Sequence, residues 1–153
     1  MRAWRNLVEV LDDLQGDLER ELTAAHQLGL GDYQVLVFLS EAPDHAMRMC
    51  DLAGRLHLSP SGLTRRLDGL VRSGLVERRP SADDRRVILA VLSDVGARRL
   101  AAAAPDHVEH VRRYFLDHLG RADVERLGTI LERARRARSA AAAANCPGST
   151  CPG

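Results

Sequence analysis

Residues 56–92 read LHLSPSGLTRRLDGLVRSGLVERRPSADDRRVILAVL, and the fold of the chain can be worked out from this stretch. Ser59 followed by Pro60 predicts the start of a helix, because a serine hydroxyl can accept from a free N–H of the first turn and proline tolerates the first helical position. Gly74 can adopt the left-handed conformation that ends a helix. Between them, apolar residues at spacings of three and four form one stripe: Leu63, Leu67, Leu70 and Val71.

Two short strands are expected after this helix. Residues 75–79 and 87–92 carry the apolar residues, while the connection 80–86 holds four charges and only one apolar residue, Ala82. The helix face opposite the apolar stripe carries Ser61, Thr64, Arg65 and Asp68. A short helix with small polar and arginine side chains outward, followed by a charged hairpin, is typical of a winged helix-turn-helix.

The stretch LTRRLDGLVRSGLVERRPSADDRRVILAVLSDVG, residues 63–96, resembles the core of the MarR family of bacterial transcription regulators. The resemblance rests on a G-L-V-x-R entry into the wing, on a D-x-R wing tip (Asp84, Arg86) and on an L-[ST]-x-x-G ending (Leu92, Ser93, Gly96). With the flanking helices it extends over about residues 7–138. It implies a homodimeric DNA-binding protein, often a repressor that a small ligand or oxidation releases.

Length and composition fit a single globular domain. The chain has 153 residues, of which 45% are hydrophobic and only 3% aromatic, so leucine, valine and alanine must fill the core. The net charge of +1 predicts no global attraction to nucleic acid. Residues 59–86, however, hold seven arginines against four acidic residues. All 22 basic residues are arginine, which we attribute to overall composition and not to function.

Several function classes find no support in the sequence. Residues 1–9 are charged and lack the apolar core of a signal peptide, and no apolar run approaches the roughly 20 residues that span a bilayer, so we expect a cytoplasmic protein without membrane contact. Three cysteines, two of them in the tail, do not form a disulfide framework. The chain has no nucleophile–base set, phosphate-binding loop or dinucleotide motif. We therefore expect neither an enzyme nor a cofactor.

The remaining patterns predict a mainly α fold with a small β wing, as a single domain over residues 1–139. Residues 4–25 form a long amphipathic helix whose stripe exceeds one small lobe, so that a second subunit is the expected cover and packing within the subunit is the alternative. Ser93 should cap the helix predicted over residues 94–119, and Pro105 should kink or interrupt it. The predicted dimerisation helices lie at 4–28 and 94–139, and the last helix within them spans 121–138. The predicted winged helix-turn-helix spans 32–92, with helices at 32–42 and 50–56 and a short strand at 46–49. Residues 140–153 should form a low-complexity, disordered tail.

The predicted DNA-binding residues fall into two groups. The helix group, placed in the major groove, is Ser59, Ser61, Gly62, Thr64 and Arg65, because the groove admits one helix and arginine can bridge guanine O6 and N7. The wing group is Arg79, Asp84, Arg85 and Arg86. The resemblance implies that Arg86 enters the minor groove and that Asp84 steadies it by a charge-assisted hydrogen bond. Asp68 is a poor base contact and should orient a neighbouring arginine.

The expected partners are a pseudo-palindromic double-stranded operator, a second copy of the chain, and a small-molecule effector in a pocket between the dimerisation helices and the DNA-binding lobe, whose lining the sequence does not identify. Two alternatives stay open. One is a thiol- or metal-responsive sensor, using Cys50, the tail cysteines Cys146 and Cys151, or the pair His107 and His110. We expect Cys50 to be a neutral replacement of the serine that commonly caps the first motif helix. The other is a winged-helix dimerisation module that binds no DNA.

Overall fold

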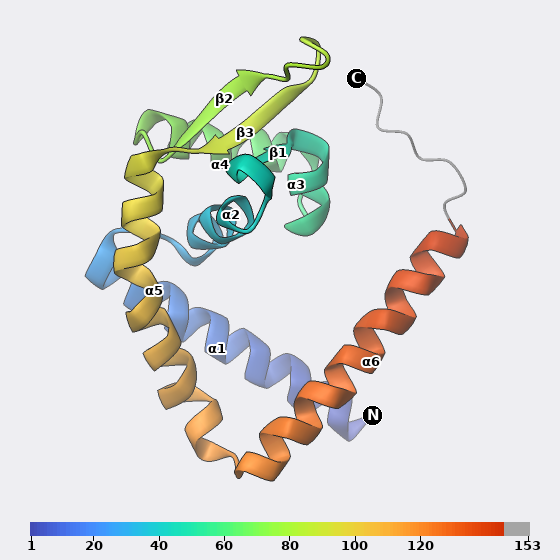
Figure 1. The fold of residues 1–153 in the computed structure, drawn as a ribbon. Helices are drawn as coiled ribbons and strands as arrows, with labels where there is room; N and C mark the ends of the chain where they lie inside the picture. Colours follow the sequence, from blue (N-terminus) through green and yellow to red (C-terminus); the bar gives the residue numbers. More distant parts are fainter. Residues whose placement is uncertain (146–153) are drawn as a thin grey trace.

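The computed structural model describes residues 1–145, and side chains through residue 138. It is mainly α with a small three-stranded wing, as predicted (Figure 1). The first elements are α1 (Arg2–His26), α2 (Leu30–Ser40), the 3-10 turn η1 (Pro43–His45), β1 (Ala46–Arg48) and α3 (Met49–Arg55). The following elements are α4 (Pro60–Arg72), β2 (Val76–Pro80), β3 (Ile88–Leu92), α5 (Asp94–Tyr114), η2 (Leu116–His118) and α6 (Arg121–Asn145).

The core of the molecule lies where α2, α3 and α4 pack against the sheet. The predicted stripe of α4 is confirmed, since Leu63, Leu67 and Leu70 are fully buried. They meet a layer of leucines from α2 and α3, while Ala90 of β3 closes the core from the sheet side. The sequence pattern missed Val35, which is completely buried because α2 is enclosed on more than one side.

The wing is an antiparallel sheet with strand order β1-β3-β2. Ala46 of β1 pairs with Val91 of β3, and Val76 of β2 pairs with Leu92. The short strand expected near residues 46–49 is therefore present and occupies one edge of the sheet. Gly74, with φ of 69°, makes the turn from α4 into β2, and the N–H of Leu75 donates to the carbonyl of Leu70 at 2.9 Å.

The prediction that Pro105 could interrupt the helix is wrong. Helix α5 runs through Pro105 and ends at Tyr114, before the predicted end, where η2 takes over. Proline removes one backbone hydrogen bond and crowds the preceding turn, at a cost of about 3 kcal/mol. Packing offsets this cost, because Ala103 is fully buried in the core and Asp106 forms a 2.8 Å hydrogen bond with His26 of α1.

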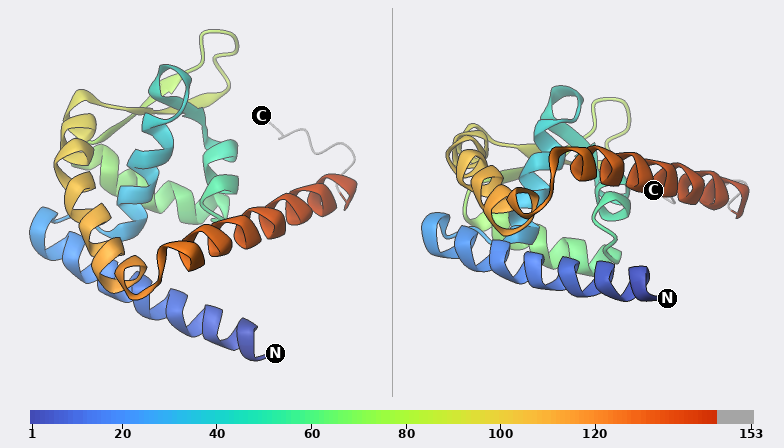
Figure 2. Two further views of the ribbon diagram at one scale, coloured as in Figure 1. Left: turned by 60° about the horizontal axis from the view of Figure 1, so that its bottom comes forward. Right: turned by 90° about the horizontal axis from the view of Figure 1, so that it is seen from below.

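Helices α1 and α6 project away from the core and enclose an open angle (Figure 2). The C-terminal half of α1 packs on α5, where Leu18 and Leu22 are buried and Glu21 forms a 3.1 Å ion pair with Arg113. The N-terminal half of α1 leaves its apolar stripe exposed. The same is true of much of α6, which continues to Asn145 through part of the alanine run. The rest of the predicted tail, residues 146–153, lies outside the described residues.

A close contact between backbones, the Ser93 junction, holds the start of α5 against the turn between α4 and β2. Ser93 caps α5 as predicted, accepting from the N–H of Gly96 at 3.0 Å, and its hydroxyl donates to the carbonyl of Gly74 at 2.6 Å. The N–H of Ser93 donates to the carbonyl of Leu75 at 3.2 Å. A Cβ added at Gly96 would lie 2.1 Å from that same carbonyl oxygen. Only glycine therefore allows the two backbones to meet.

We predict that Gly96→Ala destabilises the fold by more than about 2 kcal/mol, because backbone atoms must move apart to admit the methyl group. Gly54→Ala in α3 is the matched control, since a Cβ there meets nothing within 4 Å and alanine favours a helix by about 0.5–1 kcal/mol. Urea unfolding of both variants measures the difference. Equal stability of the two variants would contradict the close approach at Gly96.

Candidate nucleic-acid interface

The N-terminal half of α4 presents small polar side chains and one arginine to solvent. Ser59 caps the helix as predicted and accepts from the N–H of Gly62 at 3.1 Å. The Thr64 hydroxyl donates to the carbonyl of Pro60 at 2.9 Å. Ser61, Thr64 and Arg65 are all exposed. This face is accessible over the first two turns of the helix, which are the turns that reach base edges in a helix-turn-helix.

An ion pair joins α4 to the wing. Asp68 and Arg78 of β2 are 2.8 Å apart, and Arg78 also donates to the carbonyl of Thr64 at 3.3 Å. The prediction that Asp68 orients a neighbouring arginine is confirmed. Arg78 thus bridges two elements of the lobe. The pair holds the wing at a fixed position relative to the helix.

The wing tip is ordered by backbone hydrogen bonds. Ser81, the buried polar residue of the tip, donates its N–H to the carbonyl of Val87 at 2.8 Å. The carboxylate of Asp84 accepts from the backbone N–H of Arg86 at 2.9 Å. The implied role of Asp84 therefore needs correction, because this carboxylate binds the Arg86 backbone and not its guanidinium. An aspartate side chain that accepts from the backbone N–H two residues later forms a local turn. This turn sets the direction of the Arg86 side chain.

The seven arginines of residues 59–86 divide into paired and unpaired groups. Arg66 is paired with Asp32 at 3.2 Å, Arg78 with Asp68, and Arg79 with Glu77 at 2.6 Å. In the part of the chain with described side chains, four others form no ion pair: Arg65, Arg72, Arg85 and Arg86. The unpaired group keeps its full charge for an external anion. Arg79, predicted as a DNA contact, would first have to leave Glu77.

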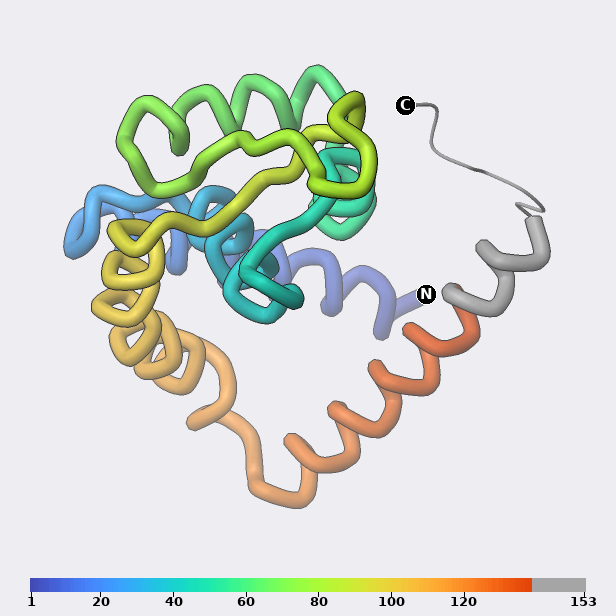
Figure 3. Tube along the Cα trace, turned by 45° about the horizontal axis from the view of Figure 1, so that its top comes forward, coloured from blue at the N-terminus to red at the C-terminus, as the bar shows by residue number. Residues whose placement is uncertain are grey.

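A groove of about 430 Å³ separates the first motif helix, the start of α4 and the wing. Thr64 and Arg86 lie on its two walls, so the structure brings the two predicted groups together at one surface. Viewed with the top of the molecule turned forward, the wing hairpin and α4 lie side by side at this surface (Figure 3). Sequence analysis missed Arg48, an exposed residue that lines the same groove at the end of β1. Its position between a strand and a helix gave no periodic pattern to identify it.

The predicted cap position of Cys50 is wrong. The N-cap of α3 is Arg48, and Cys50 is the second residue of the helix, because α3 begins at Met49 directly after β1, earlier than a cap at Cys50 would require. Its half-buried thiol lies 3.7 Å from the Asp51 carboxylate and is oriented to donate to it.

The histidines proposed as metal ligands do not come together with others. His107 stacks on Tyr33 with 4.5 Å between ring centroids, and His110 lies 3.8 Å from Glu21. Within residues 1–145, no three potential ligands gather at one place, while Cys146 and Cys151 fall outside the described residues. In the same range, no helix is both long and apolar enough to cross a bilayer.

A capped helix with an arginine face, set beside a turn-stabilised basic wing, defines the class of winged helix-turn-helix DNA-binding proteins. Residues 26–87 match the sequence profile of the MarR family. The HTH-type transcriptional repressor YetL of Bacillus subtilis is 33% identical over 113 residues, which cover 72% of this chain and 68% of YetL. The chain belongs to the MarR family, and it is a DNA-binding transcription regulator by that membership.

Solved structures agree with this assignment. AbsC, a MarR family transcriptional regulator from Streptomyces coelicolor, is 37% identical with a TM-score of 0.81, covering 90% of this chain and 93% of AbsC. Sco3205 of the same organism and family, solved in complex with DNA, is 30% identical with a TM-score of 0.81, covering 88% of this chain and 84% of Sco3205. The winged fold is thus shared over nearly the whole length of both regulators.

We predict that Asp84→Ala weakens DNA binding by about 1 kcal/mol, because the wing tip loses one hydrogen bond that sets its turn. Asp84→Asn should bind nearly like the wild type, since the amide oxygen still accepts from the Arg86 N–H. Fluorescence-anisotropy titration on a DNA fragment selected by the wild type compares the variants. Equal weakening by both substitutions would show that Asp84 acts through its charge and not through the turn.

Proposed function

We propose that the protein is a homodimeric repressor that binds a pseudo-palindromic operator and is released by a small molecule. In each subunit, α4 occupies the major groove through Ser59, Ser61, Gly62, Thr64 and Arg65. The wing follows the backbone into the minor groove through Arg79, Asp84, Arg85 and Arg86. Two-fold symmetry places the half-sites about one helical turn apart.

The observation that carries the DNA-contact assignment is the division of the arginines. Arg65 on α4 and the pair Arg85 and Arg86 at the wing tip are exposed and unpaired within the described side chains, while three other arginines of residues 59–86 are neutralised by carboxylates. Unpaired arginines suit phosphates and guanines, since no ion pair has to be broken before they bind. Because Arg79 is paired with Glu77, it would be a weaker DNA contact at the edge of the interface.

A homodimer is supported by apolar side chains that the single chain leaves exposed. On α1, Trp4 is 64% exposed and Leu7 43%; on α6, Ile130 is 59% exposed and Leu131 46%. Single exposed apolar residues are common, but a stripe of them on each of two projecting helices is typical of an interface. The same helices are the predicted dimerisation segments at residues 4–28 and 94–139.

Release by a small molecule is supported by a pocket of about 300 Å³ between α1, α2 and α5, lined among others by Leu14, Leu18, Val37 and Phe38. It lies where the projecting helices meet the DNA-binding lobe, which is the predicted location of the effector site. A dimer reads both half-sites at one separation of its α4 helices. A ligand that binds better to another separation therefore shifts the population away from DNA.

The two DNA-reading elements should respond differently to substitution. We predict that Arg65→Ala costs about 1–3 kcal/mol on the operator and relaxes base preference at one position in each half-site. Arg86→Ala should weaken binding while leaving base preferences nearly intact, and should reduce the salt slope by about one unit for each phosphate that the side chain no longer neutralises. Titrations at several salt concentrations, on operator and on scrambled DNA, measure both effects.

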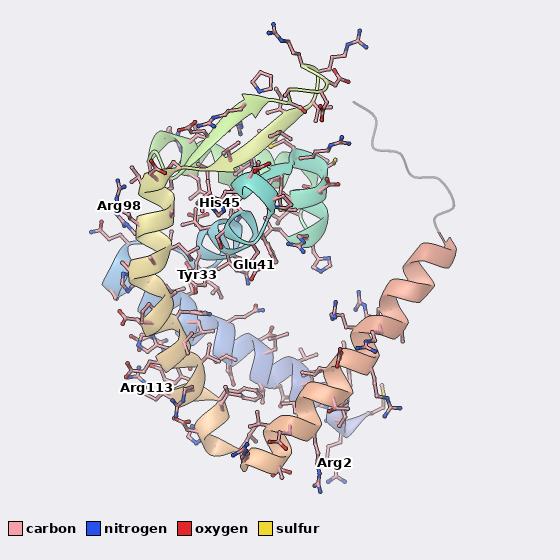
Figure 4. The ribbon with its side chains drawn as sticks, viewed as in Figure 1. Arg2, Tyr33, Glu41, His45, Arg98 and Arg113 are labelled. Atoms are coloured by element: carbon pink, nitrogen blue, oxygen red, sulfur yellow. The ribbon has the colours of Figure 1, made fainter. Side chains whose placement is uncertain are left out.

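Arg98→Ala is the matched control, because it removes one exposed positive charge from the outer side of α5, away from the wing tip (Figure 4). It should bind like the wild type. If Arg65→Ala and Arg86→Ala also bind like the wild type, the proposed DNA contacts are wrong, and a winged-helix module that only dimerises becomes the better description.

We predict a dimer at micromolar concentration in sedimentation equilibrium. The double substitution Trp4→Asp with Leu7→Asp should shift the protein toward monomer, because two charges replace apolar side chains on the projecting part of α1. Glu9→Gln on the same helix should remain dimeric. A folded wild-type monomer at this concentration would remove both the dimer and the operator symmetry.

A further inference from the structure

The first turn of α2 is held from two sides, by one residue of α1 and one residue of α4. Its N-cap, Gly29, has no side chain to accept from the free N–H groups of the turn. Glu19 of α1 supplies an acceptor instead, since its carboxylate accepts from the N–H of Leu30 at 2.5 Å. From α4, the guanidinium of Arg66 donates to the Asp32 carboxylate at 3.2 Å. This turn therefore joins α1 to α4.

The guanidinium of Arg66 is packed directly against the backbone of Gly31. A Cβ added at Gly31 would lie 1.9 Å from Nη1, 2.5 Å from Cζ and 2.8 Å from Nη2 of the arginine. The arginine thus occupies the space that a side chain at this position would fill. Gly31 determines how close Arg66 can come to α2, and the carboxylate of the next residue, Asp32, determines which way its donors point.

The pair of Arg66 and Asp32 lies at the boundary between core and solvent, with 34% of the arginine side chain and 37% of the aspartate side chain exposed. Burial raises the pKa of the Asp32 carboxyl, Arg66 beside it lowers this pKa, and the charge of Glu19 raises it. The three charged groups are therefore close enough to influence one another. An ion pair with this exposure adds little to stability, so its main effect is geometric.

The position of Arg66 in α4 gives the pair its geometric effect. Arg66 lies between Arg65, the proposed base contact, and Leu67, which is completely buried in the core. The Ser93 junction holds the C-terminal end of α4, whereas Arg66 holds the middle of the helix from the side. A rotation of α4 about its own axis would move Arg65 relative to the bases, and it would also have to break the contact of Arg66 with α2.

We infer that Arg66, Asp32 and Glu19 are positioning residues for operator recognition, because they connect the rotational setting of α4, through the first turn of α2, to the projecting helix α1. The inference rests on the proposed function, since it takes α4 as the helix that reads the bases. Asp32 and Glu19 are acidic and are repelled by phosphates, so they act on DNA binding through Arg66. Arg66 in turn orients Arg65.

The test compares binding to a DNA fragment selected by the wild type, the operator, with binding to scrambled DNA of the same length. Asp32→Ala removes a negative charge and frees Arg66, so electrostatics alone would strengthen binding to both DNAs. Loss of positioning should instead weaken operator binding about fivefold, while binding to scrambled DNA becomes stronger. Glu41→Ala is the matched control, because it removes an exposed negative charge at the other end of α2 (Figure 4). It should preserve the ratio of the two affinities.

Gly31→Ala tests the same contact without changing any charge. The added methyl group displaces only the end of the flexible Arg66 side chain, so the urea midpoint should stay close to that of the wild type. Selectivity for operator should fall about as far as in Asp32→Ala.

Two substitutions of Glu19 test the link to α1. Glu19→Ala should lower selectivity, because the first turn of α2 loses its acceptor. Glu19→Gln should retain selectivity, since its amide oxygen still accepts from the N–H of Leu30. Combining Glu19→Ala with Asp32→Ala should cause little further loss, because both changes break one connection.

A wild type that does not distinguish operator from scrambled DNA would contradict the proposed function and this inference with it. A selective wild type whose Asp32→Ala and Gly31→Ala variants are equally selective would overturn the inference alone. Stronger binding of Asp32→Ala to both DNAs would also overturn it, because Asp32 would then act only through its charge. Full selectivity in Glu19→Ala would overturn the connection to α1.

Discussion

The close approach of Gly96 to the carbonyl of Leu75 is the constraint on which the arrangement of the molecule depends. Ser93 completes it, because its N–H and hydroxyl donate to the two carbonyls of the turn that follows α4. One junction therefore attaches α5 to the end of both α4 and the wing. The position of the DNA-reading elements relative to the projecting helices is set here, by backbone atoms, and not by long flexible side chains.

Ion pairs determine which arginines are available to bind an external anion. Asp68 and Asp32 each take up one arginine and, in doing so, connect α4 to the wing and to α2. These surface pairs contribute little stability, of the order of 0–1 kcal/mol each. Their larger effect is electrostatic, since they reduce the positive charge along the middle of α4 and leave it at Arg65, at Arg72 in the last turn of the helix and at the wing tip. A chain with a net charge of only +1 thus presents a localised basic surface.

Local chemistry made much of the fold predictable. The caps Ser59 and Ser93, the left-handed turn at Gly74 and the leucine stripe of α4 each follow from the residue and its neighbours, and the structure confirms them. Features that depend on tertiary contacts were not predictable. Continuation of α5 through Pro105 depends on packing against α1 and the core, which no periodicity in α5 reveals.

The features of the candidate site likewise fall into those that the sequence predicts and those that depend on tertiary contacts. The outward face of α4 and the charged wing tip are visible as sequence patterns, and the structure places both beside one groove. The hydrogen bond that the Arg86 N–H donates to Asp84, the cap position of Arg48 and the ring contact of Tyr33 with His107 are not. They depend on where a strand ends, how a turn closes and which rings meet across helices, so residue types alone could not identify them.

The stiffness of α5 has a mechanical consequence. With 21 residues it is about 30 Å long, and its first turn is fixed rigidly to the wing by the Ser93 junction. It therefore works as a lever arm: a rotation of about 5° at its far end displaces the wing by roughly 3 Å, close to the 3.4 Å rise of one base-pair step. In the proposed dimer, an angular change of this size would shift the wing by about one position along the double helix.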